Sequence, residues 1–183
     1  MKAKDIIIAK AEELIDRLVA KEKTRLDEVR ANYEAFLVDH PVDEPKYGTY
    51  SFGENSPYKR MGQFALKSIG VEKYLTSDVF RYSGTHKIVE EVRMTTNEKR
   101  MESYLESYRV ANRVKLVRAI EKYITDEMEV QGDVYVTDGA KGVEVSAKVT
   151  TTDGVKRFKT NAVFAGGYIQ CYHYRYRGGL VKV

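Results

Sequence analysis

The segment VEVSAKVTTTDGVKRFK, residues 143–159, decides the fold class. Apolar residues alternate with polar ones from Val143 to Val149, which is the pattern of a β-strand with one buried face. Asp153 and Gly154 then form a tight-hairpin signal, and Phe158 continues the apolar alternation on the far side. The segment therefore predicts two antiparallel strands that share one buried face.

The same period of two continues on both sides of this hairpin. An earlier strand is expected from Met128 to Val136, with an irregularity at Gly132. After the hairpin, the third strand is expected to end near Ala165. The fourth, YIQCYHYRYR, covers residues 168–177 and is followed by a turn at 178–179. Residues 127–183 thus predict a four-stranded antiparallel meander with one face packed on helices.

Residues 1–126 show the helical period instead. The pattern predicts a long helix over 3–38, either continuous or restarted at Thr24, and then a loop over 39–56. Ser56 and Pro57 start a region of short helices, 57–82, in which residues 63–82 have a faint helix-turn-helix spacing; two packing helices are the alternative. A second long helix is predicted over 86–126, either continuous or jointed near Thr95, which forms a capping-box pattern with Glu98.

The second long helix carries an apolar stripe at steps of three and four, from Met101 to Tyr123. Asn112 falls within this stripe. A polar residue there either fixes the register between helices or marks the solvent edge, and we favour the edge. The predicted fold class is α+β, in which two long helices pack on the C-terminal sheet and form one folding unit with it.

Composition narrows the classes of protein to which the chain can belong. The 183 residues carry 31 Lys and Arg against 27 Asp and Glu, a net charge of +4 that does not by itself require a polyanionic partner. No apolar run is long enough for a membrane span. The single cysteine, Cys171, fits a reducing compartment, so we expect a cytoplasmic protein without a membrane partner.

No metal or nucleophile motif stands out. His40, His86 and His173 are widely spaced, and Cys171 has no second cysteine, so the spacing of a zinc site is absent. Cys171 and His173 lie two residues apart on one strand, about 7 Å, which is too far for an activated thiol. We therefore expect no metal, no cofactor and no catalytic residue, that is, a protein that is not an enzyme.

One catalytic alternative remains open. Asp133, Glu144 and Lys148 would lie on adjacent strands, where two carboxylates can hold Mg²⁺ and a lysine can assist a water molecule. The spacing only loosely resembles that of nucleases whose hairpin carries an acid followed by an acid-x-Lys triplet, because Glu144 is four residues from Lys148 rather than two.

The strongest signal is a basic and aromatic surface. The C-terminal strand alternates tyrosines on one face with arginines on the other, and residues 155–183 contain no Asp or Glu. Aromatic rings stack on bases, and cations neutralise phosphates. Core tyrosines are the structural alternative for the strand, and a solvated helix face is the alternative for the helical arginines. The candidate binding residues are Lys156, Arg157, Lys159, Tyr172, Tyr174, Arg175, Tyr176 and Arg177, with Arg109, Arg113 and Arg118 on the helix.

These observations favour a non-enzymatic binding protein. The leading hypothesis is a protein-binding regulator or inhibitor of nucleic-acid machinery of the phage or mobile-element type, for example an anti-defence or anti-CRISPR-like protein. Its partner would be a protein or a nucleoprotein, since Tyr and Arg are also enriched at protein interfaces. Direct binding of DNA or RNA by the basic aromatic sheet is the first alternative, and a metal-dependent nuclease is the second. A homodimer through the long helices is a further option.

Overall fold

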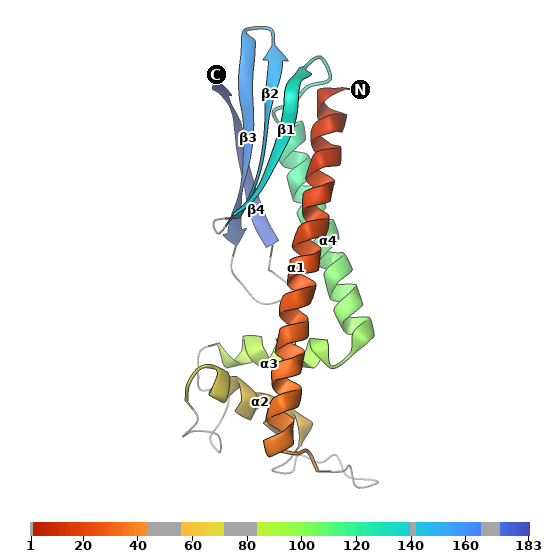
Figure 1. Ribbon diagram of the computed structural model, residues 1–183, viewed down its shortest axis with the longest axis vertical. Coiled ribbons are helices and arrows are strands. Elements are labelled where there is room, and N and C mark those ends of the chain that lie inside the picture. The colour runs from red at the N-terminus through yellow and green to blue at the C-terminus, as the bar shows by residue number, and fades with distance from the viewer. Residues whose placement is uncertain (1, 44–55, 72–83, 140–141, 166–172) are drawn as a thin grey trace. The chain divides into compact units, whose positions relative to one another are not determined.

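The computed structural model describes residues 2–43, 56–71, 84–139, 142–165 and 173–183, and it confirms the predicted α+β class (Figure 1). Two of the helices are long, and the strands follow them in the chain. The elements are α1 (Ala3–Asp39), α2 (Pro57–Ser68), α3 (Thr85–Thr95), α4 (Glu98–Glu121), β1 (Glu129–Gly139), β2 (Gly142–Thr151), β3 (Gly154–Ala165) and β4 (His173–Lys182).

The chain forms two compact units, and each is described by itself. Unit 1 contains residues 1–22 and 104–183, and unit 2 contains residues 23–103. The long helices α1 and α4 contribute to both units. None of the helices in the described ranges is both long and apolar enough to cross a lipid bilayer.

The sheet of unit 1 is an antiparallel meander in the order β1-β2-β3-β4, as the alternation predicted. The β2–β3 hairpin closes where Thr151 pairs with Gly154, whose φ of +104° is a conformation that suits glycine. The expected irregularity in β1 is a register shift between Gln131 and Tyr135, beside Gly132 with φ +76°.

One face of this sheet packs on helices. Val145, Val149 and Phe158 are fully buried in a cluster with Ile7 of α1 and Leu116 of α4. In Figure 1 the first turns of α1 and the later turns of α4 lie along that face. Each such side chain contributes about 1.5–3 kcal/mol when it leaves water. Alternate residues of β2 and β3 must then point away from the helices.

Asn112 corrects one expectation about α4. Its side chain is completely buried rather than at a solvent edge, and its amide Nδ2 donates a hydrogen bond of 2.8 Å to the carbonyl oxygen of Tyr108. The bond satisfies a polar group that would otherwise be costly to bury. Asn112 is therefore part of the packed stripe of α4.

Ion pairs join the start of α1 to the segment after α4. Lys2 Nζ lies 3.0 Å from Asp126 Oδ2, and Lys4 Nζ lies 3.5 Å from Asp126 Oδ1. The hydrogen bond from Lys2, together with the positive charges of both lysines, lowers the pKa of Asp126 below its usual value. The Asp126 carboxylate is solvent-exposed, so these pairs add little stability.

The last strand differs from its predicted bounds. β4 begins at His173 and continues to Lys182, so Gly178 and Gly179 lie inside the strand rather than in a turn after Arg177. Residues 166–172, which include the first part of the predicted strand, lie outside the described residues. The backbone of β3 gives the reason for one glycine: a Cβ at position 178 would lie 2.9 Å from the carbonyl oxygen of Lys159.

This close approach predicts different outcomes for the two neighbouring glycines. Gly178→Ala should lower the free energy of unfolding by about 1–3 kcal/mol, because strand backbone must shift to admit the new methyl group. Gly179→Ala is the matched control, since its Cβ would meet nothing within 4 Å. Urea unfolding of the two variants checks the difference; equal midpoints would contradict the packing of β4 on β3.

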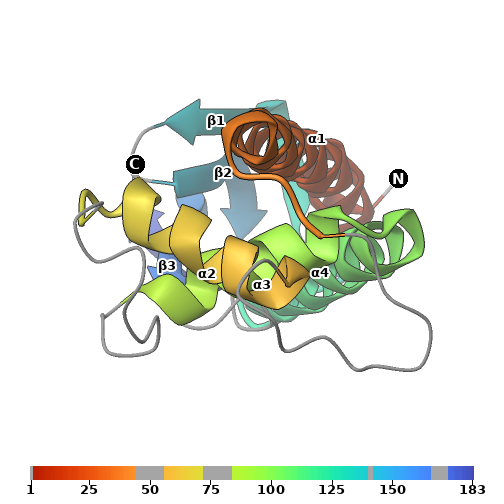
Figure 2. The same cartoon turned by 90° about the horizontal axis from the view of Figure 1, so that it is seen from below.

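Unit 2 has an aromatic cluster of its own. Tyr33 and Phe36 of α1 pack with Phe64 of α2 and Val92 of α3. The ring of Phe64 meets Tyr33 at 5.4 Å and Phe36 at 5.7 Å between centroids, both edge-on. Burial raises the pKa of the Tyr33 hydroxyl, opposed in part by the charge of Arg60. Figure 2 shows α2 and α3 side by side, in agreement with their direct packing.

The helix boundaries settle several open points. Ser56 caps α2 as predicted, accepting a hydrogen bond of 3.3 Å from the Lys59 amide. The second long stretch divides into α3 and α4, but the capping residue is Asn97, which accepts from the Arg100 amide at 3.1 Å. The predicted Thr95 cap is wrong, because the Thr95 hydroxyl donates back to the Val92 carbonyl inside α3.

The first long stretch is a single helix. α1 continues without a break through Thr24, so a second helix does not start there.

The helix-turn-helix spacing predicted over 63–82 is described only in its first part. That part coincides with the end of α2 and with Gly70, whose φ is +81°. The remaining part, residues 72–82, lies outside the described residues.

A half-buried ion pair joins α1 to α3 in unit 2. Arg25 of α1 places Nη1 2.8 Å from Oε1 of Glu91 in α3, although the contact lacks hydrogen-bond geometry. The Glu91 side chain is only 6% exposed, whereas that of Arg25 is 39% exposed. A carboxylate buried to this extent depends on its cation, because its own hydration is lost.

Arg25→Met should therefore lower the free energy of unfolding by about 1–3 kcal/mol, less than for a fully buried pair. Arg30→Met is the matched control, because Arg30 pairs with the exposed Glu34 and should cost about 0.2–1 kcal/mol. Adding Glu91→Gln to Arg25→Met should recover part of the loss by removing the buried charge. Chemical denaturation of the unmodified protein and the three variants measures these free energies of unfolding. Equal destabilisation by Arg25→Met and Arg30→Met would contradict the role of the buried carboxylate.

Candidate functional site

The candidate site lies on the sheet face that the helices do not cover. We call it the open face and define it by the exposed or half-buried residues Tyr135, Ser146, Lys148, Arg157 and Lys159. The strand register arranges them in two cross-strand rows. Tyr135 pairs with Ser146 and Ser146 with Lys159 in one row, and Lys148 pairs with Arg157 in the next.

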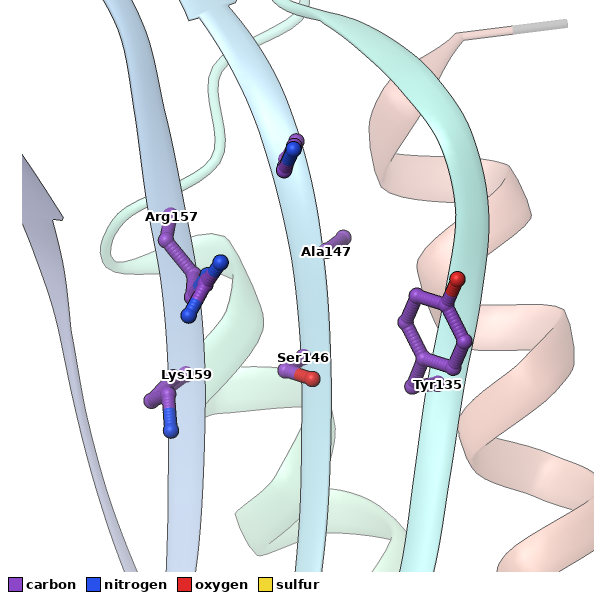
Figure 3. A pocket seen from close by; sticks show the side chains of 6 residues that line it. Tyr135, Ser146, Ala147, Arg157 and Lys159 are labelled. Carbon is purple, nitrogen blue, oxygen red and sulfur yellow. The ribbon is translucent and has the colours of Figure 1, made fainter. Parts of the chain in front are cut away.

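These rows enclose a hollow of about 250 Å³, lined by Tyr135, Ser146, Ala147, Lys148, Arg157 and Lys159. Figure 3 shows Tyr135 on one side of it and Arg157 and Lys159 on the other, with Ser146 between them. Ser146 explains the depression, because a small side chain separates larger ones on the neighbouring strands. The Tyr135 side chain is 62% exposed, so its ring is accessible to a ligand.

Lys148 and Arg157 are direct cross-strand partners, which is an unfavourable arrangement for two cations. Side chains at such positions begin about 4.5–5.5 Å apart at Cβ. Both residues are exposed, and within the described part of the chain neither has a carboxylate at ion-pair distance. At this end of the hollow the sheet therefore presents positive charge that no carboxylate of the described residues neutralises.

Lys159 is neutralised in part by a carboxylate on the next strand. Its Nζ lies 3.2 Å from Oε1 of Glu144, and both side chains remain partly exposed. The pair is accessible to solvent, so its strength is modest and an external anion can compete with Glu144 for the ammonium group. Lys159 thus provides a third cation whose availability depends on its neighbour.

The other predicted lysine of β3 does not join this group. Lys156 pairs with Val149, a core residue, so the strand alternation separates it from Arg157 and Lys159. Its Nζ lies 3.0 Å from Oδ2 of Asp153, next to the hairpin turn. Lys156 therefore supports the turn and does not line the hollow.

Two of the three predicted arginines of α4 have internal partners in unit 1. Arg109 forms an ion pair with Asp16 of α1, and Arg113 Nε lies 2.7 Å from Oε1 of Glu12 on the same helix. Arg118 is exposed in the last turn of α4. Two of the three side chains are thus engaged between helices, away from the β-strands that form the hollow.

For most of the tyrosine-rich strand, the structure describes either the backbone alone or nothing. Tyr172 lies outside the described residues. For Tyr174, Arg175, Tyr176 and Arg177 the structure gives the position in β4, where Arg177 pairs with Asn161 and Arg175 with Val163, but their side chains lie outside the description. The expectation that these side chains bind a partner stays a prediction.

The residues of the predicted nuclease site are only partly assembled. Glu144 and Lys148 lie on β2 with Ser146 between them, while Asp133 is exposed in the irregular part of β1. The carboxylate of Glu144 already contacts Lys159. Among the residues that the structure describes, no three His, Cys, Asp or Glu side chains gather as a metal-binding group.

Comparison with protein-family models, with curated proteins and with solved structures found no match in any of the three.

Sequence reasoning missed Tyr135 and Ser146, and it considered Lys148 only as part of a nuclease. The strand register that brings these residues together could be derived from the predicted hairpins. Once the turn pairs Thr151 with Gly154, counting back along both strands brings Lys148 opposite Arg157 and Ser146 opposite Lys159. The pairing of Gly139 with Gly142 likewise brings Tyr135 opposite Ser146.

Proposed function

We propose that the chain is a non-enzymatic nucleic-acid-binding protein, and that the open face holds the phosphate backbone of its ligand. The observation that carries the proposal is the direct cross-strand pairing of Lys148 and Arg157 beside the hollow. Two cations in that position repel each other and so oppose folding, and a bound phosphate removes this repulsion. The nucleic acid in turn releases its condensed counterions, because the cations of the protein neutralise its phosphates.

The chemistry of the remaining lining supports the same ligand. Lys159 adds a third cation, Tyr135 adds an accessible aromatic ring, and Ser146 adds a hydroxyl that can donate to a phosphate oxygen. Cytoplasmic location, which the single cysteine favours, would give the protein access to nucleic acid. The cations and the hydroxyl of the open face suit contacts to phosphates, which carry no sequence information, so we expect little sequence specificity.

Removal of the central cations tests the proposal. Lys148→Gln with Arg157→Gln should weaken binding of labelled oligonucleotides by about tenfold at low salt, because two phosphate contacts are lost. For the unmodified protein, three phosphate contacts to a single strand give a slope of log affinity against log salt of about −2, and the double variant should flatten it to about a third of that value. Fluorescence anisotropy at several salt concentrations measures both quantities.

The matched control is Lys99→Gln with Arg100→Gln, which changes the net charge equally at exposed positions at the start of α4. This control should retain the affinity and the slope of the unmodified protein. An equal loss in both double variants would mean that overall charge, and not the open face, attracts the ligand. Unchanged affinity in Lys148→Gln with Arg157→Gln would contradict the site.

The ion pair between Glu144 and Lys159 suggests a variant that should bind the ligand more tightly rather than more weakly. Glu144→Gln should tighten binding by about two- to fivefold, because Lys159 is released and a negative charge near the phosphates is removed. The same anisotropy titration measures it. A Mg²⁺-dependent nuclease with Glu144 as a ligand would instead lose cleavage in this variant, so an incubation with Mg²⁺ and labelled substrate separates the two functions.

A second candidate is the regulator or inhibitor of nucleic-acid machinery, of the phage or mobile-element type, which would bind a protein or nucleoprotein. The observation that favours it is the exposed Val181, which pairs with Arg157 and extends the basic row with an apolar side chain. Arginine beside accessible apolar groups suits a protein partner. A single protein retained at fixed stoichiometry after nuclease treatment, without affinity for oligonucleotides, would select this candidate.

A further inference from the structure

Tyr135 gives the open face a feature that phosphate binding alone does not require. Tyr135 lines the hollow, is 62% exposed as a residue, and belongs to the same cross-strand row as Ser146 and Lys159. Most large apolar side chains of this sheet are directed to the helices, as with Phe158 and Val149. An exposed aromatic ring in a row of polar residues gains little stability for the fold, so its contribution is to be sought in a ligand.

We propose that the open face selects single-stranded nucleic acid, with an unpaired base stacked on Tyr135 and the adjoining phosphates held by Lys148, Arg157 and Lys159. The inference rests on the proposed function and adds the strand state of the ligand to it. In a duplex the faces of the bases are already stacked on their neighbours and cannot meet a side chain, whereas unpaired bases offer both faces.

The dimensions of the site agree with a base and its own backbone. Tyr135 on β1 and Lys159 on β3 are two strands apart, about 10 Å at the usual strand spacing. The hollow of about 250 Å³ is smaller than the ~300–1,000 Å³ typical of pockets for drug-sized ligands. It therefore suits one planar base next to the cations, while the rest of the strand lies across the open sheet.

The charges around the hollow indicate a path for the backbone of such a strand. Lys148 and Arg157 occupy the row next to Tyr135, so a strand that stacks one base there brings its phosphate towards both cations. Glu144 lies on the other side of Ser146 along β2, where it contacts Lys159. Cation and carboxylate therefore flank the hollow along β2, which favours a backbone path on the Lys148 side.

Four probes with equal numbers of phosphates distinguish stacking from charge. They are single-stranded DNA, single-stranded RNA and a strand of abasic nucleotides, all of one length, and a DNA duplex of half that length. Both single strands should bind about five- to hundredfold tighter than the duplex and the abasic strand, since stacking contributes about 1–3 kcal/mol per base. The DNA and RNA arms show whether the 2′-hydroxyl affects affinity.

Variants of Tyr135 assign the effect to this ring. Tyr135→Ala should lower affinity for single strands by about five- to hundredfold and leave affinity for the duplex and the salt slope unchanged. Tyr135→Phe should retain the affinity, because stacking needs the ring and not the hydroxyl. Tyr58→Ala, at an exposed tyrosine of α2, is the matched control. Thermal unfolding of each variant confirms that the fold is intact.

The outcomes separate this inference from the function on which it rests. If all four probes bind equally, or Tyr135→Ala binds single strands as the unmodified protein does, the single-strand inference is wrong while the phosphate site stands. If no probe binds, the nucleic-acid function is itself wrong. If the probes bind but Lys148→Gln with Arg157→Gln has no effect, the open face is not the phosphate site and the inference fails with it. Preference for single strands that disappears only in Tyr135→Ala supports both.

Discussion

The burial of one sheet face on two helices is the constraint on which unit 1 depends. Val145, Val149 and Phe158 can be buried against Ile7 and Leu116 only if the strands keep strict alternation and a fixed register. A slip of one residue would turn the basic residues of β2 and β3 into the core. The same burial that stabilises the sheet therefore fixes which side chains gather on the open face, and the site needs no separate structural support.

The cations of the chain differ in whether they face a carboxylate or another cation. Arg109 and Arg113 face carboxylates of α1, so their charge is used to join two helices. Lys148 and Arg157 face each other instead, and replacing either by threonine would leave the buried face untouched. Charge content by itself cannot distinguish these cases. The distinction arises from which residues the packing brings opposite each other, and it favours the sheet over the helix as the binding surface.

Much of the fold follows from local patterns. Periods of two and of three to four residues separate the sheet from the helices, and Asp153-Gly154 closes the central hairpin as expected. Local patterns mislead where a tertiary contact decides. Gly178 has the sequence context of a turn, but glycine is needed there because the backbone of β3 passes too close for a side chain. Asn112 is polar, which suggests a solvent edge, but it is buried and its side chain forms a hydrogen bond. The open face escapes detection because it combines residues of three strands, and register, rather than any motif, brings them together.

The size of the site limits how tightly it can act alone. Three cations and one aromatic ring offer few phosphate contacts and one stacked base, and such binding weakens as salt rises. A single copy of this face would therefore bind a strand weakly at physiological salt and gain affinity chiefly from a second attachment to the same ligand or to a protein that carries it, because linked contacts raise the effective concentration. Val181 beside Arg157 provides one such apolar contact point. Under the proposed function, strand binding and attachment to a nucleoprotein would be complementary uses of one surface, and the base stacked on Tyr135 would determine where along the strand the protein binds.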